Sequence, residues 1–305
     1  MRTAICRLLF PFHVGFPSTI LIKKGGRPPA AAGRVICMKY GSCLLLLATP
    51  EDPLAVTKIP IIAEAGYDYA EVSLARIYSL PEREVGEYRD AFDRHGLPVE
   101  VFNNAMPRGL TLIGPNSDQT ANAAYISRAV LLAQRMGVRL ITMSGPNQRS
   151  VPPEFLWREG FPQYVEFLKR FSDAAGAAGI ELAIEPINDE EHGFIATVSE
   201  ARRAVDAAEC KNVNLIVDTY HFRKQNDSME DAVKAVRDGK LVHIHHATRE
   251  KRVYPQEWDR EESKAVLLPL LDAGYRGRIS IEAYAGAAAQ ELPAANRLLR
   301  ALTPV

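Results

Sequence analysis

The sequence lacks the long apolar stretch that a membrane-spanning helix requires. Proline, lysine and arginine interrupt every candidate run before it reaches the roughly 18 to 20 residues needed to cross a bilayer. Cysteine is also scarce, since the chain of 305 residues has four, and no pair of them has CxxC spacing. We therefore predict reduced thiols, a cytoplasmic location and no membrane partner.

An excess of charge of one sign is missing as well. The 37 lysines and arginines balance 37 aspartates and glutamates. Such a balance provides no general attraction for a phosphate backbone, so we expect no nucleic-acid partner. The hydrophobic content of 47% is typical of globular domains and excludes a disordered or fibrous chain.

Acidic residues are absent from the start of the chain to Thr49, whereas six basic residues precede Met38. With the apolar segment at 8–16, this composition would suit a targeting peptide. Pro11 interrupts this segment and Pro17 follows it, however, and an upstream extension explains the composition better. We therefore expect residues 1–37 to be a disordered N-terminal extension and residues 38–305 to form one catalytic domain.

Short apolar runs alternate with longer segments of helical periodicity after this extension, which is typical of α/β proteins with parallel strands. The expected strands are residues 40–47, 69–72, 99–102, 140–144, 181–185, 213–218, 241–245 and 278–282. The expected helices are residues 53–65, 82–95, 118–136, 161–178, 198–208, 228–237, 261–273 and 287–301. Eight such units match a (β/α)8 TIM barrel, a fold of about 250 residues.

Glycine marks the ends of many of these units. Five of the expected helices end at a glycine that precedes the next strand, namely Gly66, Gly96, Gly137, Gly179 and Gly274. Glycine is common just after a helix because it adopts the left-handed conformation without steric cost. A doubly wound open sheet is the alternative fold, but no GxGxxG motif follows the first strand to support it.

The last four expected strands each end in a side chain that can bind a metal. These side chains are Glu185, Asp218, His245 and Glu282. In a TIM barrel the carboxyl ends of the strands surround one mouth, where the active site lies, so the four groups should converge. Three carboxylates so close together would repel each other unless a divalent cation neutralised them. Oxygen-rich ligation with one imidazole suits Mn²⁺, Mg²⁺ or Co²⁺ better than a structural zinc.

The segments around these four residues resemble those of the xylose isomerase-like sugar isomerases and epimerases, a family that includes the ketose 3-epimerases. The matching segments are Ile184-Glu185-Pro186-Ile187-Asn188, Val217-Asp218-Thr219-Tyr220-His221, His243-Ile244-His245 and Ile279-Ser280-Ile281-Glu282. The resemblance implies a xylose isomerase-like barrel with one divalent metal, most often Mn²⁺, with Zn²⁺ also possible. It implies that Glu185, Asp218, His245 and Glu282 bind this metal, and that the two glutamates also move protons.

The same resemblance implies residues that bind substrate. The histidine three residues after the metal-binding aspartate corresponds to His221, and the glutamate six residues after the first ligand corresponds to Glu191. Ketose epimerases tend to place a substrate-binding arginine six residues after the metal-binding histidine, where this chain has Lys251. Arg249 and Arg252 stand on either side, and we take Arg252 as the candidate.

The chemistry of such a site follows from its groups. A divalent ion that binds a carbonyl and a neighbouring hydroxyl acidifies the C–H bond between them and stabilises the resulting enediolate. If Glu185 and Glu282 lie on opposite faces of the substrate, one removes a proton and the other returns one, which is epimerisation. With only one face used, the same site would isomerise an aldose to a ketose, through proton return to the neighbouring carbon, or would only exchange the proton. His221 would hydrogen-bond the developing oxyanion or, nearly as well, orient a carboxylate.

Several other residues each have two alternative roles. His243 should point into the barrel like His245, where it would be either a second ligand or a packed core histidine. His246 should point outward to the helices. Glu71 would line the pocket or only hydrogen-bond neighbouring strands. Trp157 would form a lid over a sugar or pack as satellite core. Arg149 is a candidate contact for a phosphate, with a solvated arginine as the default.

We therefore predict a metal-dependent isomerase or epimerase of a sugar or sugar phosphate, with a possible homo-oligomeric state. The alternative on the same scaffold is a lyase of the inosose or dehydroshikimate dehydratase type, because enolisation next to a leaving hydroxyl can end in loss of water. A non-catalytic sugar-binding protein would need no metal, and four converging ligands make it the weakest of the three hypotheses.

Overall fold

The computed structural model describes residues 38–144, 155–191 and 194–303. The predicted N-terminal extension and the predicted phosphate contact of Arg149 lie outside these residues. Within the described part of the chain, no helix is long and apolar enough to cross a membrane.

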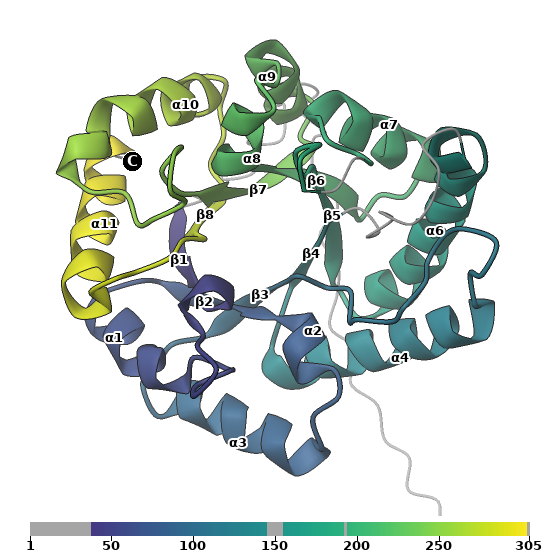
Figure 1. The fold of residues 1–305 in the computed structure, drawn as a ribbon, viewed down its shortest axis with the longest axis horizontal. Coiled ribbons are helices and arrows are strands. Elements are labelled where there is room, and N and C mark those ends of the chain that lie inside the picture. Colours follow the sequence, from purple (N-terminus) through teal and green to yellow (C-terminus); the bar gives the residue numbers. More distant parts are fainter. Residues whose placement is uncertain (1–37, 145–154, 192–193, 304–305) are drawn as a thin grey trace, which may run out of the picture. The chain divides into compact units, whose positions relative to one another are not determined.

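Eight parallel strands form a closed barrel at the centre of the fold, in the order of the sequence (Figure 1). They are β1 (Lys39–Cys43), β2 (Tyr69–Ser73), β3 (Val99–Asn103), β4 (Leu140–Ser144), β5 (Glu181–Glu185), β6 (Val213–Asp218), β7 (Leu241–His246) and β8 (Arg278–Ile281). The barrel closes where β1 pairs with β8, from Lys39 beside Arg278 to Ser42 beside Ile281. The predicted TIM barrel is therefore confirmed.

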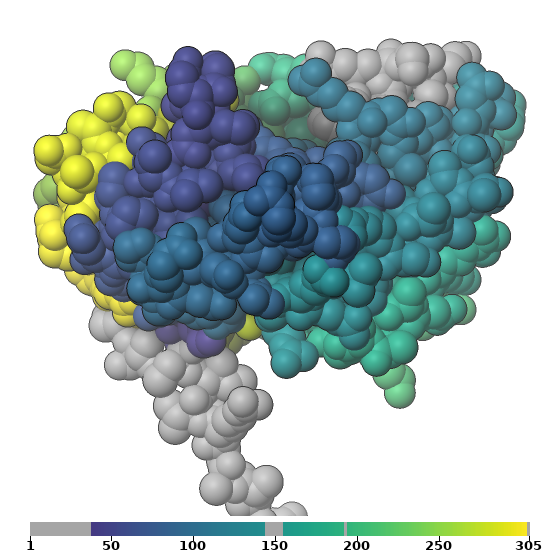
Figure 2. Space-filling view, turned by 90° about the horizontal axis from the view of Figure 1, so that it is seen from below, coloured from purple at the N-terminus to yellow at the C-terminus, as the bar shows by residue number. Residues whose placement is uncertain are grey.

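Helices surround the barrel and follow the strands in turn. The α-helices are α1 (Ile59–Glu64), α2 (Leu74–Ile77), α3 (Glu82–Asp93), α4 (Gln119–Met136), α6 (Phe161–Ala177), α7 (Val198–Ala208), α8 (Thr219–Lys224), α9 (Met229–Arg237), α10 (Arg260–Asp272) and α11 (Ala288–Leu302). The space-filling view shows the face of the molecule formed mainly by the first half of the described chain, coloured purple to teal (Figure 2).

The first strand and the first helix are shorter than predicted. The strand ends at Cys43, and Leu45–Leu47 form a 3-10 turn instead. The helix predicted from residue 53 begins at Ile59, because the Asp52 carboxylate accepts the amides of residues 56 and 57 at 2.8 and 2.9 Å and holds a separate turn there. Leucine and alanine runs fit strand, helix and turn alike, so the pattern alone could not separate them.

The predicted helix-ending glycines all adopt the left-handed conformation, with φ between 61 and 105°. Gly137 directly follows α4, and its amide bonds back to the last turn of the helix. A different constraint acts at Gly41 in β1, where an added Cβ would lie 2.3 Å from the Tyr69 ring. Glycine is required there because the Tyr69 ring fills the interior of the barrel.

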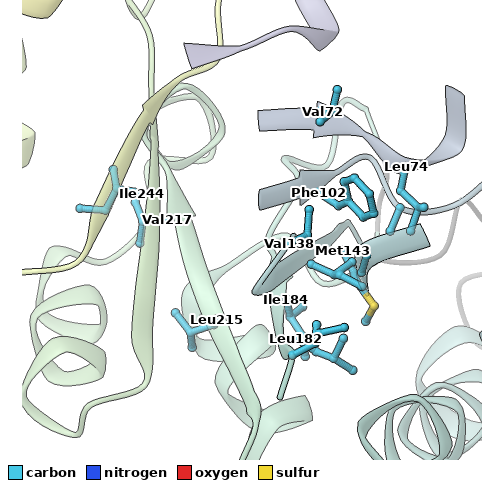
Figure 3. Packing of buried hydrophobic residues seen from close by; sticks show 14 of the residues in the cluster. Val72, Leu74, Phe102, Val138, Met143, Leu182, Ile184, Leu215, Val217 and Ile244 are labelled. Atoms are coloured by element: carbon cyan, nitrogen blue, oxygen red, sulfur yellow. The ribbon is translucent and has the colours of Figure 1, made fainter. Parts of the chain in front are cut away.

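The core has two layers. Outward-facing residues of the strands pack beneath the helices, including Val72, Phe102, Ile184 and Val217 (Figure 3). A smaller cluster fills the barrel interior and comprises Tyr69, Val101, Leu140, Ala183 and Ile216. Side chains on a strand alternate between its two faces, so the inward position two residues further on belongs to the next layer toward the carboxyl end. On most strands the inward-facing side chain in this next layer is polar. The apolar cluster lies directly beneath this polar layer and forms the floor of the barrel mouth.

Candidate metal and catalytic site

The four predicted ligands come together at the carboxyl end of the barrel. One ligand atom from each of Glu185, Asp218, His245 and Glu282 lies within 4.8 Å of the others. All four side chains are buried. Each residue stands at or next to the last position of its strand, on the face that turns inward, which is why residues far apart in sequence share one centre.

Local structure directs the Asp218 carboxylate. Its Oδ1 atom accepts the amide of Tyr220 at 2.7 Å and that of His221 at 3.3 Å, so Asp218 caps the start of α8. Capping uses one oxygen of the carboxylate and fixes its rotamer. The other oxygen, Oδ2, is left to face the cluster, 3.9 Å from His245 Nδ1.

The two ring nitrogens of His245 face different partners. Nδ1 lies 3.0 Å from Glu185 Oε1 and 3.4 Å from Glu282 Oε2, so it points into the cluster. Nε2 lies 2.8 Å from Glu71 Oε1 on the opposite side of the ring. Burial disfavours a charged imidazole, but the surrounding carboxylates outweigh it and raise the pKa of His245 above its usual range.

Negative charge is in excess at this site. Burial, together with repulsion from Glu185 and Asp218, raises the pKa of Glu282 to about 7. Burial also acts on Asp218, but attraction to Arg252 and two histidines lowers the pKa of this carboxyl to about 2. Once His245 has lost its extra proton, three carboxylates and one imidazole form a donor set that fits a hard or borderline divalent cation, so the residues present fit the predicted metal.

Arg252, the predicted substrate-binding arginine, extends into the site. Its Nη2 atom lies 2.9 Å from Asp218 Oδ2 and 2.5 Å from Glu282 Oε2, and its guanidinium lies over the Tyr220 ring at 4.9 Å. The backbone at Arg252 is left-handed, with a φ of 49°. Lys251, six residues after His245, is exposed instead.

His221 and Glu191 lie beside the cluster, joined by Asn188. The Asn188 amide nitrogen lies 2.6 Å from His221 Nδ1 and 3.2 Å from a Glu191 carboxylate oxygen. Because the amide donates to Nδ1, the ring proton of His221 belongs on Nε2, which faces Asp218 at 3.9 Å. A donor on His221 therefore points toward the same centre as the four ligands.

Two neutral residues of the site were missed by the sequence analysis. The Asn103 amide nitrogen donates to Glu282 Oε1 at 2.6 Å and to Cys43 Sγ at 2.9 Å. Both are the last residues of their strands, β3 and β1. Asn103 directly follows the predicted strand 99–102, which was an available signal, whereas Cys43 lies inside the longer strand predicted over 40–47. Burial and the nearby carboxylates raise the pKa of the Cys43 thiol, so it is a neutral neighbour of Glu282.

The structure shows where the residues with two alternative roles lie. His246 faces outward as expected, with Nδ1 3.0 Å from the Thr219 hydroxyl and Nε2 2.9 Å from that of Ser263 on α10. Trp157 packs against Phe194 with ring centroids 5.1 Å apart, which supports the satellite-core reading. Glu71 and His243 are fully buried inside the barrel and contact each other.

Comparison with known proteins agrees with this fold. Residues 59–302 match the family model of the xylose isomerase-like TIM barrel, and the chain belongs to this family. A probable ketose 3-epimerase of Synechocystis sp. is 24% identical over 245 residues, covering 78% of this chain and 81% of that protein. An inosose isomerase of Bacillus velezensis is 28% identical over 263 residues, covering 79% and 88%.

Solved structures show the same fold. A D-psicose 3-epimerase, crystallised in the presence of D-fructose, superposes with a TM-score of 0.73 at 19% identity, covering 88% of this chain and 100% of that one. The curated relatives are isomerases and epimerases by name, and we accordingly class this chain as an isomerase enzyme.

Proposed function

We propose that this chain is a divalent-metal-dependent isomerase or epimerase that removes a proton next to the carbonyl of a sugar or sugar phosphate. The observation that carries the proposal is the convergence of three buried carboxylates and His245 Nδ1 within 4.8 Å at the mouth of the barrel. The expected metal is Mn²⁺. Mg²⁺, Co²⁺ and Zn²⁺ are the alternatives, because they also bind carboxylate oxygens and imidazole nitrogens. When bound, a divalent cation acidifies the C–H bond beside a carbonyl by drawing electron density from the oxygen.

Glu185 and Glu282 are the proposed acid and base. They come from β5 and β8, and the ligand-bearing strands β6 and β7 lie between them in the barrel. A substrate held over the centre therefore meets one carboxylate from each side. If one takes a proton from the substrate carbon and the other returns a proton to the opposite face, the configuration at that carbon inverts.

Arg252, His221 and Glu191 are the proposed substrate-binding groups. Arg252 is partly buried beside two of the proposed ligands and carries several N–H donors in a fixed plane, which suits adjacent hydroxyl or carbonyl oxygens. His221 directs its Nε2 proton toward the centre, where it can stabilise negative charge on a substrate oxygen. Glu191 beside it can accept a hydroxyl proton.

The substrate class is inferred from the site and from the relatives together. The relatives' names include ketose, psicose and inosose, which are polyhydroxylated ketones. A lyase on the same scaffold would also begin with proton removal beside a carbonyl. The two reactions differ in the fate of the intermediate, so product analysis separates them. The cytoplasmic location and a homo-oligomeric state stay predictions.

Hydrogen–deuterium exchange tests the proposal. The purified protein, loaded with Mn²⁺ in D₂O, is incubated with a panel of ketoses, ketose phosphates and inososes and followed by NMR. We expect exchange at a carbon next to the carbonyl of at least one compound, abolished by EDTA, restored by Mn²⁺ and lost in Glu282→Gln. Retention of exchange after complete metal removal would contradict the proposed chemistry. Absence of stable metal binding would overturn it.

A further inference from the structure

A carboxylate outside the ligand set lies directly behind one of the ligands. Glu71, on β2, is fully buried in the barrel interior and belongs to the layer above the apolar floor. Its Oε1 atom lies 2.8 Å from His245 Nε2, and its Oε2 atom lies 3.1 Å from His243 Nε2. One carboxylate therefore joins two imidazoles that stand two residues apart on β7.

This arrangement fixes the position of the ring protons. An ionised carboxylate only accepts hydrogen bonds, so the nitrogen facing it must carry a proton. Both histidines therefore hold a proton on Nε2. In neutral His245 this leaves the lone pair on Nδ1, the nitrogen that faces Glu185 and Glu282. His243 Nδ1 has no hydrogen-bond partner among the described residues, which agrees with an unprotonated nitrogen there.

The contact also holds the ring in place. Rotation of His245 about its side-chain bonds would break its 2.8 Å contact to Glu71. Glu71 in turn cannot move away without losing His243, whose ring packs edge-on against that of His245 with centroids 4.8 Å apart. The three side chains are completely buried, so water does not replace a lost partner.

The geometry does not support a second metal ion bound by Glu71, His243 and His245. Glu71, His243 and His245 do offer ligand atoms within 4.8 Å of one another. A cation there would take the lone pair of His245 Nε2 and would have to be desolvated completely inside the barrel. Below it lies the apolar layer with Tyr69 and Val101. Two direct hydrogen bonds already satisfy the carboxylate.

We propose that Glu71, held by His243, is a positioning residue that presents His245 Nδ1 to the metal. This inference rests on the proposed function, because it assigns Glu71 a role toward the proposed metal. A hydrogen bond from the outer nitrogen of a metal-binding imidazole to a carboxylate orients the ring and raises its basicity, and losing such a partner typically weakens metal binding about 10- to 100-fold.

Four variants separate positioning from simple stability. Glu71→Gln keeps the size but puts an amide N–H against one of the two imidazole N–H groups. His243→Leu removes the donor that holds Glu71, and His243→Gln retains a donor of similar reach. Tyr69→Phe is the matched control, because it removes one buried hydrogen bond of 2.9 Å, to Ser280, from the same strand without touching a ligand.

Isothermal titration of metal-free protein with Mn²⁺ provides the first measurement. We expect Glu71→Gln to bind Mn²⁺ about 10- to 100-fold more weakly than the wild type, and His243→Leu to show a smaller loss of affinity. The Mn²⁺ affinities of His243→Gln and Tyr69→Phe should remain within about twofold of the wild type. Thermal melting of each metal-free variant shows which of them fold. Long-range ¹H–¹⁵N spectra of the Zn²⁺-loaded wild type give the second measurement, with the His245 proton expected on Nε2.

The possible outcomes are distinct. If folded Glu71→Gln binds Mn²⁺ within twofold of the wild type, or if the His245 proton is found on Nδ1, the positioning role is wrong while the proposed function stands. If Glu71→Gln does not fold, equal binding by His243→Leu and His243→Gln overturns the inference. If the wild type itself binds no metal, the proposed function fails and the inference with it.

Discussion

The two ends of this barrel carry opposite excesses of charge. At the amino end, a cavity of about 510 Å³ is lined by Lys39, Arg278 and other basic residues, with Glu100 between them. Glu100 pairs with both cations, at 2.7 Å from Arg278. At the carboxyl end, the buried carboxylates of Asp218 and Glu282 share one guanidinium, that of Arg252, and Glu185 lies beside them.

The difference lies in what compensates the charge. The basic side chains at the amino end are partly exposed, so water solvates the charge that Glu100 does not neutralise. The carboxylates at the other end are buried, and uncompensated buried charge is costly. The charges at the amino end are thus compensated by their partners and by water, whereas the negative charge at the carboxyl end is fully compensated only if a cation binds. This matches the division of TIM barrels into a stabilising face and a catalytic face.

The largest difference between the two ends should appear in catalysis. We expect Glu282→Gln to lower the rate of substrate proton exchange by about 10²- to 10⁴-fold, because a proton-transferring group is lost. Glu100→Gln, which removes a carboxylate at the amino end, should leave the rate within about twofold. Single-turnover exchange in D₂O with saturating Mn²⁺ measures both. Equal losses in the two variants would show that the site is not at the carboxyl end.

Removing an arginine from each end should separate substrate binding from metal binding. Arg252→Ala should reduce kcat/KM by about 10- to 100-fold, since charge-assisted hydrogen bonds to substrate are lost. Its affinity for Mn²⁺ should not fall, because the guanidinium no longer pairs with Asp218 and Glu282. Arg278→Ala should change neither value. Weaker Mn²⁺ binding by Arg252→Ala would mean that Arg252 supports the metal rather than the substrate.

Metal uptake should depend on pH in a defined direction. In the metal-free protein the pKa of Glu282 is raised to about 7, and that of His245 is also raised. Both groups must lose their protons before they bind a metal, so protons compete with the metal below pH 7. We expect Mn²⁺ affinity to fall at least about tenfold per pH unit below 7 and to level off only at a pH where His245 has also lost its extra proton. Titrations in buffers of different ionisation enthalpy count the released protons, and affinity independent of pH between 5 and 7 would contradict the expectation.

The smallest expected effects concern stability, and they have opposite signs. A carboxyl whose pKa is raised on folding destabilises the folded state at any pH where the unfolded form is ionised, and Glu282 is such a group. Metal-free Glu282→Gln should therefore be more stable than the wild type at pH 8, by about 1 to 3 kcal/mol. Glu100→Gln should be less stable, by about 1 kcal/mol, because its partners are half-exposed. Urea unfolding with EDTA present measures both, and equal signs would remove the contrast between the ends.

The sequence was sufficient to predict the barrel and the convergence of the four candidate ligands, for a physical reason. Parallel strands produce short apolar runs, and the residue at the end of such a run, on its inward face, must lie at the mouth. Glu185, Asp218 and Glu282 were found because a carboxylate at the end of an apolar strand is unusual.

The remaining features depend on contacts that the pattern does not contain. Asn103 and Cys43 are uncharged, so their residue types do not mark them as candidates for a metal or proton-transfer site. The link from Glu71 to His243 and His245 joins β2 to β7 across the barrel interior, and no local pattern gives that proximity. The left-handed backbone at Arg252 brings this residue, rather than Lys251, into the site.

Anomalous diffraction from crystals grown with Mn²⁺ tests the central claim most directly. The account predicts one strong peak per chain, about 2.0 to 2.6 Å from oxygens of Glu185, Asp218 and Glu282 and from His245 Nδ1. The Arg252 guanidinium should have moved away from the position it shares with Asp218 and Glu282. A peak bound elsewhere, or a mouth in which Arg252 keeps both contacts at saturating Mn²⁺, would contradict it.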